Sequence, residues 1–319
     1  MASELRTIAA SALPALIKVA GDRAGVRFIE FFTANIRNHH TRRAYSRAVG
    51  EFLAWCGDAG VPSIVDVQPL HVAAWIEMQV RAVSAPTVKQ QLAAIRHLFD
   101  WLVTGQVVPV NPAASVRGPR HVVRTGKTAV LEPAEARALL DSIDANTPAG
   151  SRDRALIALM VYSFARIGAT VGMKVEDVFT QNRRLWVRLH EKGGNDHAMP
   201  CHHNLEQALA AYIDGAGLAA DPKGPLFRTL GRGTETLTRT PLPQANAYAM
   251  IRRRALAAGI ATKIGNHSFR ATGITAYLKN GGSLEKAAAM ANHASTRTTQ
   301  LYDRRQDEMS LDEVERILI

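Results

Sequence analysis

Apolar side chains recur at helical spacing through the first third of the chain, which places them on one face of each predicted helix. A first helix is predicted to begin near Thr41, its expected N-cap, and to end at Gly57. A second is predicted over residues 69–80, and a third after Pro86. The apolar stripes of the first and third helices consist of Tyr45, Val49, Phe52, Leu53, Cys56, Val88, Leu92, Ile95, Phe99 and Leu102. Three such helices predict a small helical bundle.

Residues 105–128 interrupt this pattern with prolines, glycines and scattered basic side chains, and predict a linker. The composition fits a solvated loop as well as an extended segment that crosses the backbone of a polyanion. The full length of 319 residues is enough for two domains that each bury a core.

Beyond this linker the pattern mixes helices with short strands. Residues 185–189 and 197–201 flank a turn at residues 193–195, Gly-Gly-Asn, and predict a β-hairpin. Ser310 and Glu313 form a capping-box start for a last amphipathic segment. Helices are predicted near residues 132–143, 152–165, 203–213, 243–258, 267–280, 283–290 and 310–319.

Charge narrows the choice of partner. The chain carries 39 Lys and Arg against 28 Asp and Glu, a formal net charge of +11, whereas residues 303–319 are acidic. Such a surplus indicates a polyanionic partner, either nucleic acid or an acidic membrane surface. The longest charge-free apolar run, residues 155–165, is shorter than the roughly 20 residues that span a membrane. Residues 8–17 fit a leader or a short amphipathic helix, and two cysteines imply no disulfide framework.

Six side chains, spread over four short stretches, are of the types that bind phosphate, transfer protons or attack phosphorus. Arginine forks bind two phosphate oxygens and stabilise charge that grows on them. Lysine and histidine transfer protons, and tyrosine is a nucleophile that leaves a stable phosphodiester. The six residues are Arg166, Lys192, His267, Arg270, His293 and Tyr302. Each is commonplace alone, so the prediction of metal-free phosphoryl transfer depends on their combination.

In this order the stretches resemble the tyrosine recombinase, or phage-type integrase, family. Residues 164–168, FARIG, are similar to the family's first-arginine box, and residues 267–272, HSFRAT, to its His-x-x-Arg box. Residues 292–302 resemble the box that holds the second histidine and the nucleophile, and Lys192 falls in the hairpin where the family keeps its catalytic lysine. A looser likeness upstream involves Thr41, Tyr45, Phe52, Trp55 and Asn111-Pro112.

The resemblance implies an α+β fold, mainly α with a small β-hairpin or sheet, arranged as a two-domain, C-shaped DNA clamp. It implies a leader over residues 1–24, a SAM-like helical core-DNA-binding domain over 25–116 and a linker over 117–128. A catalytic domain over 129–302 precedes a tail over 303–319 that docks on a neighbouring protomer. The leader is shorter than the arm-binding domain of lambda-type integrases, which favours an enzyme that acts on short inverted core sites.

The same resemblance implies a site-specific recombinase or integrase that uses no metal, ATP or other cofactor. Tyr302 would attack a scissile phosphate and form a 3′-phosphotyrosyl link. Arg166 and Arg270 would clamp the non-bridging oxygens, and Lys192 would protonate the departing 5′-oxygen. His267 would act as acid, base or relay.

His293 would donate a hydrogen bond to the phosphate. The free 5′-hydroxyl of a partner strand would then attack the phosphotyrosine, and strands would exchange through a Holliday junction. The implied partners are double-stranded DNA with short inverted core sites and three further copies of the chain in a tetrameric synapse. The implied location is the cytoplasm, at the bacterial nucleoid, and no membrane is involved. The enzyme would be either the integrase of a mobile element or a resolvase of replicon dimers.

Two positions depart from the family's pattern. The acidic residue that often stands three positions after the first arginine is replaced by Ala169. That acid usually supports the active-site histidine from behind, so the orientation of His267 must have another source. The glycine common before the second histidine is replaced by Asn292.

Further basic residues are predicted to contact DNA phosphates, which positions a protein without specifying sequence. They are His39, Arg42, Arg43, Arg47, Lys89, Arg96, Arg120, Arg124, Arg252 and Arg253. For the three-arginine run at residues 252–254, a solvated helix face is an equal alternative. His197, Cys201, His202 and His203 cluster in sequence but lack the spacing of a structural zinc site, so no metal site is predicted.

Two other functions stay open on the same fold. One is a catalytically silent or structural DNA-binding protein, and the other is a type IB topoisomerase that relaxes supercoils without synapsis. The intact set of six residues favours an enzyme over the first alternative. The acidic amphipathic tail favours a synapsing recombinase over the second.

Overall fold

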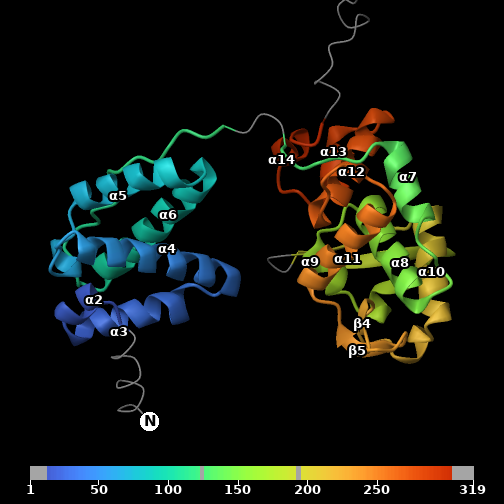
Figure 1. The fold of residues 1–319 in the computed structure, drawn as a ribbon, viewed down its shortest axis with the longest axis horizontal. Helices are drawn as coiled ribbons and strands as arrows, with labels where there is room; N and C mark the ends of the chain where they lie inside the picture. Colours follow the sequence, from blue (N-terminus) through green and yellow to red (C-terminus); the bar gives the residue numbers. More distant parts are fainter. Residues whose placement is uncertain (1–12, 123–125, 192–194, 304–319) are drawn as a thin grey trace, which may run out of the picture. The chain divides into compact units, whose positions relative to one another are not determined.

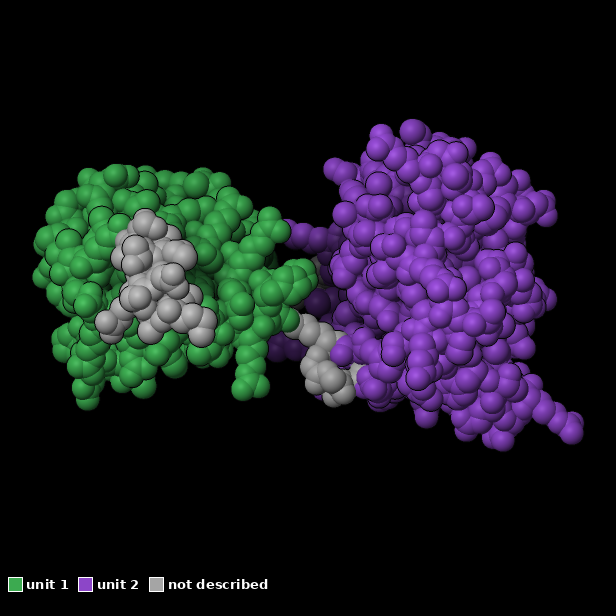
Figure 2. Space-filling model, turned by 90° about the horizontal axis from the view of Figure 1, so that it is seen from below, with its two compact units in different colours: residues 1–122 green, residues 123–319 purple. Residues whose placement is uncertain are grey.

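The computed structural model describes residues 13–122, 126–191 and 195–303, and the chain divides into two compact units, residues 1–122 and 123–319 (Figures 1 and 2). The first unit is helical throughout its described elements, and the second combines helices with two small sheets. The predicted fold class, mainly α with a small β component, is confirmed.

The first unit is a bundle whose core lies where three long helices meet. The ring of Phe52 packs edge-on against Trp75 and Phe99, with centroids 5.3 and 6.5 Å apart. All three side chains are buried, as expected where the apolar faces of amphipathic helices pack together. The elements are α2 (Ala15–Val19), α3 (Asp22–Glu30), a π-helical turn η1 (Phe31–Asn35), α4 (His39–Asp58), a 3-10 turn η2 (Ile64–Asp66), α5 (Pro69–Ala82) and α6 (Ala85–Thr104).

The start of α4 corrects one prediction. Asn38, not Thr41, is the N-cap, and its side chain accepts hydrogen bonds from the backbone N–H groups of His40 and Thr41 at 3.0 and 3.1 Å. Asn and Thr both cap helices, and the asparagine comes first along the chain. The helix therefore begins at His39, which adds residues 39–41 to its first turn.

The predicted leader over residues 1–24 is also corrected for the part that the structure describes. Leu16 and Ile17 of α2 and Ala24 of α3 are buried in the core of the first unit. Residues 13–24 therefore belong to the bundle, because their apolar side chains complete its core. Residues 1–12 lie outside the described part of the chain.

The segment that follows α6 packs onto the helical bundle of the first unit. Val108, Ala113 and Val116 are buried in the same core. The guanidinium of Arg96 donates to the carbonyl of Ala113 at 3.1 Å and to that of Val116. The first half of the predicted linker region is thus part of the bundle.

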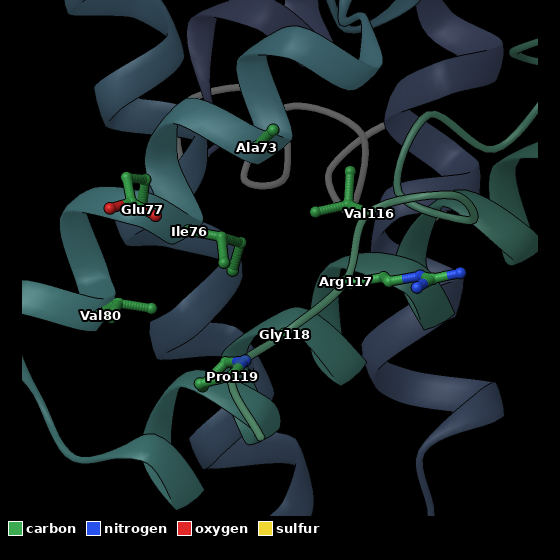
Figure 3. Close-up of a pocket in the computed structure, with 8 residues that line it drawn as sticks. All are labelled: Ala73, Ile76, Glu77, Val80, Val116, Arg117, Gly118 and Pro119. Carbon is green, nitrogen blue, oxygen red and sulfur yellow. The ribbon is translucent and has the colours of Figure 1, made fainter. Parts of the chain in front are cut away.

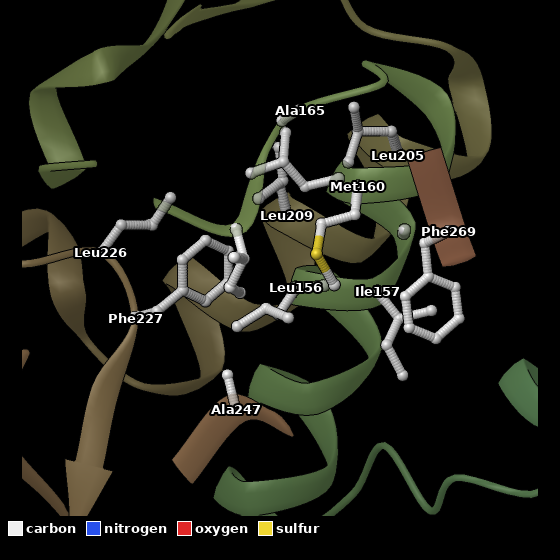
Figure 4. Close-up of a cluster of buried hydrophobic side chains, with 14 of the residues drawn as sticks. Leu156, Ile157, Met160, Ala165, Leu205, Leu209, Leu226, Phe227, Ala247 and Phe269 are labelled. Carbon is white, nitrogen blue, oxygen red and sulfur yellow. The ribbon is translucent and has the colours of Figure 1, made fainter. Parts of the chain in front are cut away.

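The second unit is built around α8, which lies against α10 and α12 (Figures 1 and 4). Leu156, Ile157 and Met160 of α8 are buried among side chains from other elements, including Phe227 and Phe269. Its helices are α7 (Pro133–Asp141), α8 (Pro148–Tyr162), α9 (Ile167–Val171), α10 (His203–Gly215), α11 (Gln244–Ala257), α12 (Asn266–Lys279), α13 (Leu284–Met290) and α14 (Thr296–Gln300), with 3-10 turns η3 (Val175–Asp177) and η4 (Leu218–Ala220).

The predicted hairpin is present and is part of a larger sheet. Strands β2 (Arg184–Glu191) and β3 (Asn195–Pro200) pair antiparallel, with Leu189 opposite His197. Strand β1 (Val178–Gln181), which the sequence analysis did not predict, pairs with β2 on its other edge. A second sheet pairs β4 (Arg228–Leu230) with β5 (Leu237–Pro241).

Candidate active site

Five of the six predicted catalytic side chains lie in one cluster of the second unit. Lys192, the sixth, lies outside the described residues. The cluster is held together by a hydrogen bond between Arg270 and His293 and by the parallel rings of His293 and Tyr302. Arg166 and His267 lie close enough for their charges to interact with that of Arg270.

Arg166 is positioned by the sharp end of α8. The helix stops at Tyr162, earlier than the sequence predicted, and Phe164 adopts a left-handed φ of 55°. The chain then turns so that Arg166 becomes the N-cap residue of the short helix α9. A non-glycine residue with positive φ is uncommon and is often found at functional sites. The Arg166 side chain is 39% exposed, so its guanidinium can reach a ligand outside the protein.

Arg270 is a fixed, buried donor. Its side chain is only 2% exposed, and its guanidinium donates to the carbonyls of Phe164 and Ala291, the latter at 2.6 Å. Burial lowers the pKa of Arg270 to about 10, with a further decrease from the positive charge of Arg166. An arginine held this way has a fixed position before an anion binds.

His293 has a defined tautomer. Its Nε2 lies 2.6 Å from Nη2 of Arg270, and because a guanidinium only donates, Nε2 must accept. The proton therefore resides on Nδ1, which donates to Oγ1 of Thr299 at 2.8 Å. Burial, followed by the charges of Arg270 and Arg166, lowers the pKa of His293 to about 4, so the ring is neutral. In this geometry His293 orients Arg270 and directs no N–H at a phosphate.

Asn292 stands where the family commonly has glycine, and its backbone gives the reason why asparagine is tolerated. Its φ is 46°, in the left-handed region. Asparagine adopts this conformation more readily than other residues with a side chain. The chain can therefore turn out of α13 and direct His293 toward Arg270.

His267 and Arg270 lie one turn apart in the first half of α12, as their spacing predicted. Burial, followed by the charges of Arg270 and Arg166, lowers the pKa of His267. The ring is thus also favoured in its neutral form, which can accept or donate a proton.

Tyr302 is held by its backbone just after α14. Its N–H donates to the carbonyl of Thr299 at 2.9 Å, and its carbonyl accepts from Oγ1 of Thr275 at 2.9 Å. Its ring lies parallel to that of His293, with centroids 6.0 Å apart. A hydrogen bond with Tyr302 raises the pKa of Arg270, which places the hydroxyl beside that guanidinium. The nucleophile predicted from sequence therefore lies next to the buried Arg270.

Glu191 is a member of the cluster that the sequence analysis did not select. Its side chain is 4% exposed, its Oε2 accepts from Nη1 of Arg166, and its Oε1 lies 4.0 Å from Nη1 of Arg270. Glutamate is rarely buried unless it is paired, so its place at the end of an apolar strand was the available signal.

The sequence profile of the Phage integrase family matches residues 129–309, and that of the phage integrase N-terminal SAM-like domain matches residues 27–106. The chain belongs to the phage integrase family. It is a tyrosine recombinase by this membership, so the predicted family and the predicted class of enzyme are confirmed.

Curated and solved relatives agree with the membership. Tyrosine recombinase XerC of Xylella fastidiosa (strain M23) is 27% identical over 282 residues, which cover 86% of this chain and 91% of the relative. XerH recombinase, solved in a post-cleavage complex with a palindromic difH substrate, shares the fold with a TM-score of 0.68 at 17% identity over 98% of this chain and 92% of that one. A lambda integrase tetramer bound to a Holliday junction gives a TM-score of 0.69 at 15% identity, over 97% and 82% of the two chains.

The residues predicted to contact DNA differ in how free their side chains are. Arg96 is engaged by two backbone carbonyls, and Arg42 donates twice to the carbonyl of Ile36, at 2.8 and 3.1 Å. Arg47 pairs with Glu51 at 2.8 Å but is 82% exposed. Exposed members are His39, Arg43, Arg47, Lys89, Arg120, Arg252 and Arg253, and Arg124 lies outside the described residues.

The third arginine of the run at 252–254 has a structural partner. Arg254 donates to Oδ2 of Asp153 at 2.8 and 3.0 Å, while Arg152 donates to Oδ1 of the same carboxylate. Asp153 is 1% exposed, so this pairing satisfies a buried charge. The first two arginines of the run are exposed, whereas Arg254 is partly buried.

Two other regions, a cavity in the first unit and the histidine-rich stretch near residue 202, contain none of the predicted catalytic residues. A cavity of about 370 Å³ in the first unit is lined by α5 and by residues 116–119, and its Arg117 points away from α5 (Figure 3). His202 stacks on Tyr162 with ring centroids 4.4 Å apart. Within the described ranges, no three or more His, Cys, Asp or Glu side chains are arranged to hold a metal ion, and no helix is long and apolar enough to cross a membrane.

Proposed function

We propose that this chain cleaves and rejoins DNA through Tyr302, by the tyrosine recombinase reaction. One observation carries the proposal: a tyrosine hydroxyl lies beside a buried arginine that two backbone carbonyls and a neutral histidine hold in place. The tyrosine oxygen attacks the scissile phosphorus, a 3′-phosphotyrosyl ester forms, and the 5′-oxygen of the DNA leaves with a proton. Because the phosphotyrosyl ester replaces the phosphodiester without hydrolysis, the reverse attack by a 5′-hydroxyl reseals a strand.

The two arginines divide the work of phosphate binding. Arg270 is rigid and buried, whereas Arg166 is partly exposed at the N-cap of α9. Together they stabilise charge on the non-bridging oxygens, where arginine forks make paired hydrogen bonds. Removing one such donor costs about 3–4 kcal/mol of transition-state stabilisation.

The histidines and the lysine supply the proton steps. His267, neutral at physiological pH, is suited to accept the tyrosine proton. His293 orients Arg270, and it donates to phosphate only if its Nε2 is released from Arg270 and protonated. Lys192 is proposed as the acid that protonates the leaving 5′-oxygen, on the family resemblance alone.

The DNA partner is proposed from the same family. The XerH structure is a complex with a palindromic difH substrate, and the lambda integrase tetramer is bound to a Holliday junction. We extend this to a tetramer of the present chain on double-stranded DNA with short inverted sites. In it, residues 13–116 form the core-DNA-binding domain, residues 117–128 the linker and residues 129–302 the catalytic domain, and the tail at 303–319 docks on a neighbouring protomer. The excess of positive charge fits such a partner, and DNA affinity should fall steeply with salt. We place its action at cytoplasmic, nucleoid DNA, on a mobile element or on replicon dimers.

Covalent trapping tests the proposal directly. Wild type and Tyr302→Phe are incubated in EDTA with nicked half-site DNA taken from candidate element ends. We expect a denaturation-resistant protein–DNA adduct with wild type and none with Tyr302→Phe. Sequencing the attached DNA then gives the core site.

Other outcomes separate the alternatives. Retention of DNA on a native gel without an adduct, even on pre-assembled synaptic substrates, would favour a silent binding protein. An adduct together with relaxation of supercoiled DNA, and no recombinant product, would favour a topoisomerase.

A further inference from the structure

The site has two arginines but lacks the acid that the family often places on the helix after the first arginine. That position is Ala169 on α9, a buried residue that carries no charge. The structure shows a carboxylate entering the same cluster from another element, the end of β2. Helix α9 and strand β2 pack against each other, so the two elements face one region.

We propose that Glu191 is a positioning residue that holds the guanidiniums of Arg166 and Arg270 for the phosphate. The inference rests on the proposed function, because it concerns the same site. Glu191 contacts the arginines and is not assigned a contact with DNA.

The burial of Glu191 indicates that its carboxylate is held at the end of β2 by its partners. Along β2, Val187, Leu189 and Glu191 alternate onto the buried face of the strand. The first two are apolar core residues, and a charged third member is costly to bury unless it is paired. Its pairing with Arg166 meets that cost, and the end of β2 is thereby fixed beside α9.

Charge balance supports the same role. Two guanidiniums and one carboxylate leave one net positive charge, which matches the single negative charge of a phosphodiester. Without Glu191 the charge of Arg166 would act unopposed on the buried Arg270. The positive charge of Arg166 already lowers the pKa of Arg270, and Glu191 raises it. The groups that face Arg270 are Arg166, Glu191, His293 and Tyr302, with His267 and His197 within range of its charge.

One oxygen of the carboxylate is still available. Oε1 of Glu191 is buried and makes no hydrogen bond to any described residue. His197 on β3 is nearby: its pKa is lowered by burial and partly restored by the charge of Glu191. The carboxylate can therefore accept a further hydrogen bond without leaving Arg166.

The experiment compares wild type, Glu191→Gln and the double variant Ala169→Glu with Glu191→Gln, which returns the acid to α9. Glu176→Gln, which removes an exposed carboxylate 3.5 Å from Lys174 in the same unit, is the matched control. Single-turnover adduct formation on nicked half-site DNA is measured from pH 6 to 10, together with the Kd for DNA.

We expect Glu191→Gln to slow adduct formation by about 10- to 100-fold while the Kd changes by less than about threefold, since a positioning group acts mainly in the transition state. The pKa of Arg270 is about 10 in the wild type and should fall without the carboxylate. The alkaline decrease in rate should therefore move to lower pH, which a purely structural defect would not cause. The double variant should recover part of the rate, and Glu176→Gln should match wild type.

An unchanged rate and an unchanged alkaline limb in Glu191→Gln would overturn the proposal. Faster cleavage would also overturn it, because Glu191 would then be an internal competitor for the phosphate. If Glu191→Gln does not fold, Glu191→Asp keeps the charge with a shorter reach, and a wild-type rate in that variant would contradict the proposal.

A second measurement does not depend on cleavage. NMR titration of the Arg270 guanidinium in the free protein should show a lower pKa in Glu191→Gln than in wild type, or in Glu191→Asp if the first variant does not fold, and an equal pKa would overturn the inference. If wild type forms no Tyr302-dependent adduct, the proposed function fails while this titration still decides the position of Glu191.

Discussion

At the scale of single residues, burial decides which protons the site holds. Arg270 has its pKa lowered to about 10 and His293 to about 4, so one is charged and the other neutral across the physiological range. The direction of the hydrogen bond between them then follows, because only the histidine can accept. Thr299, fully buried, fixes the other end of the imidazole.

Thr299→Val tests this chain of hydrogen bonds with little change in volume. We expect adduct formation to slow by about 5- to 10-fold, because a neutral hydrogen bond contributes roughly 1 kcal/mol and the imidazole would lose its fixed orientation. The measurement is single-turnover cleavage of half-site DNA, with the exposed neighbour Thr298→Val as control. An unaltered cleavage rate in a folded Thr299→Val protein would show that the tautomer is fixed by Arg270 alone.

At the scale of elements, the site depends on how closely α12 approaches the end of α8. A Cβ built on Gly273 of α12 would lie 2.1 Å from the carbonyl oxygen of Val161 and 2.8 Å from the ring of Phe164. Glycine is therefore required by this helix contact. The same contact brings Arg270 to the carbonyl of Phe164, so packing and catalytic geometry share one interface.

Gly273→Ala should therefore harm both stability and cleavage. We expect the free energy of unfolding of the second unit to fall by about 2–3 kcal/mol, because the backbone of α8 would have to shift to make room for the added methyl group. Urea denaturation and the cleavage rate measure the two effects. Gly215→Ala, at the end of α10 with nothing within 4 Å of the added Cβ, should leave both nearly unchanged. Equal stability of Gly273→Ala and wild type would mean that the helix contact is looser than described.

At the scale of the whole molecule, the chain consists of two compact units and an acidic C-terminal segment. The described part ends at residue 303, just after the nucleophile. The amphipathic pattern over residues 310–319 lies beyond it, so docking of the tail on a second protomer stays a prediction.

Deletion of residues 306–319 tests whether the tail docks on a neighbouring protomer. We expect the truncated chain to form the Tyr302 adduct on a single half-site at close to the wild-type rate, because all described site residues are present. Recombination between two full sites should drop severely, since an exchanged tail would contribute to the synapse. Gel assays of both products check this, with full-length Tyr302→Phe as the baseline. Wild-type recombination by the truncated chain would rule out an essential docking role.

The sequence by itself determined the elements and the chemistry that are local in the chain. Apolar spacing of 3 and 4 residues defined the helices from α4 to α6, because helix periodicity depends only on near neighbours. The hairpin followed from its glycine turn, and the order of the arginine, histidine and tyrosine boxes led to the family. Strand β1 and helix α14 were missed because both are short, and short elements depend on their neighbours.

Only the tertiary structure decided which side chains are partners. The sequence could not show that Glu191 pairs with Arg166 across 25 positions, or that Arg96 is taken up by backbone carbonyls and not left free for DNA. It could not assign the proton of His293, which depends on burial and on Arg270 from another helix. These properties arise from desolvation and from long-range contacts, and both exist only once the chain has folded.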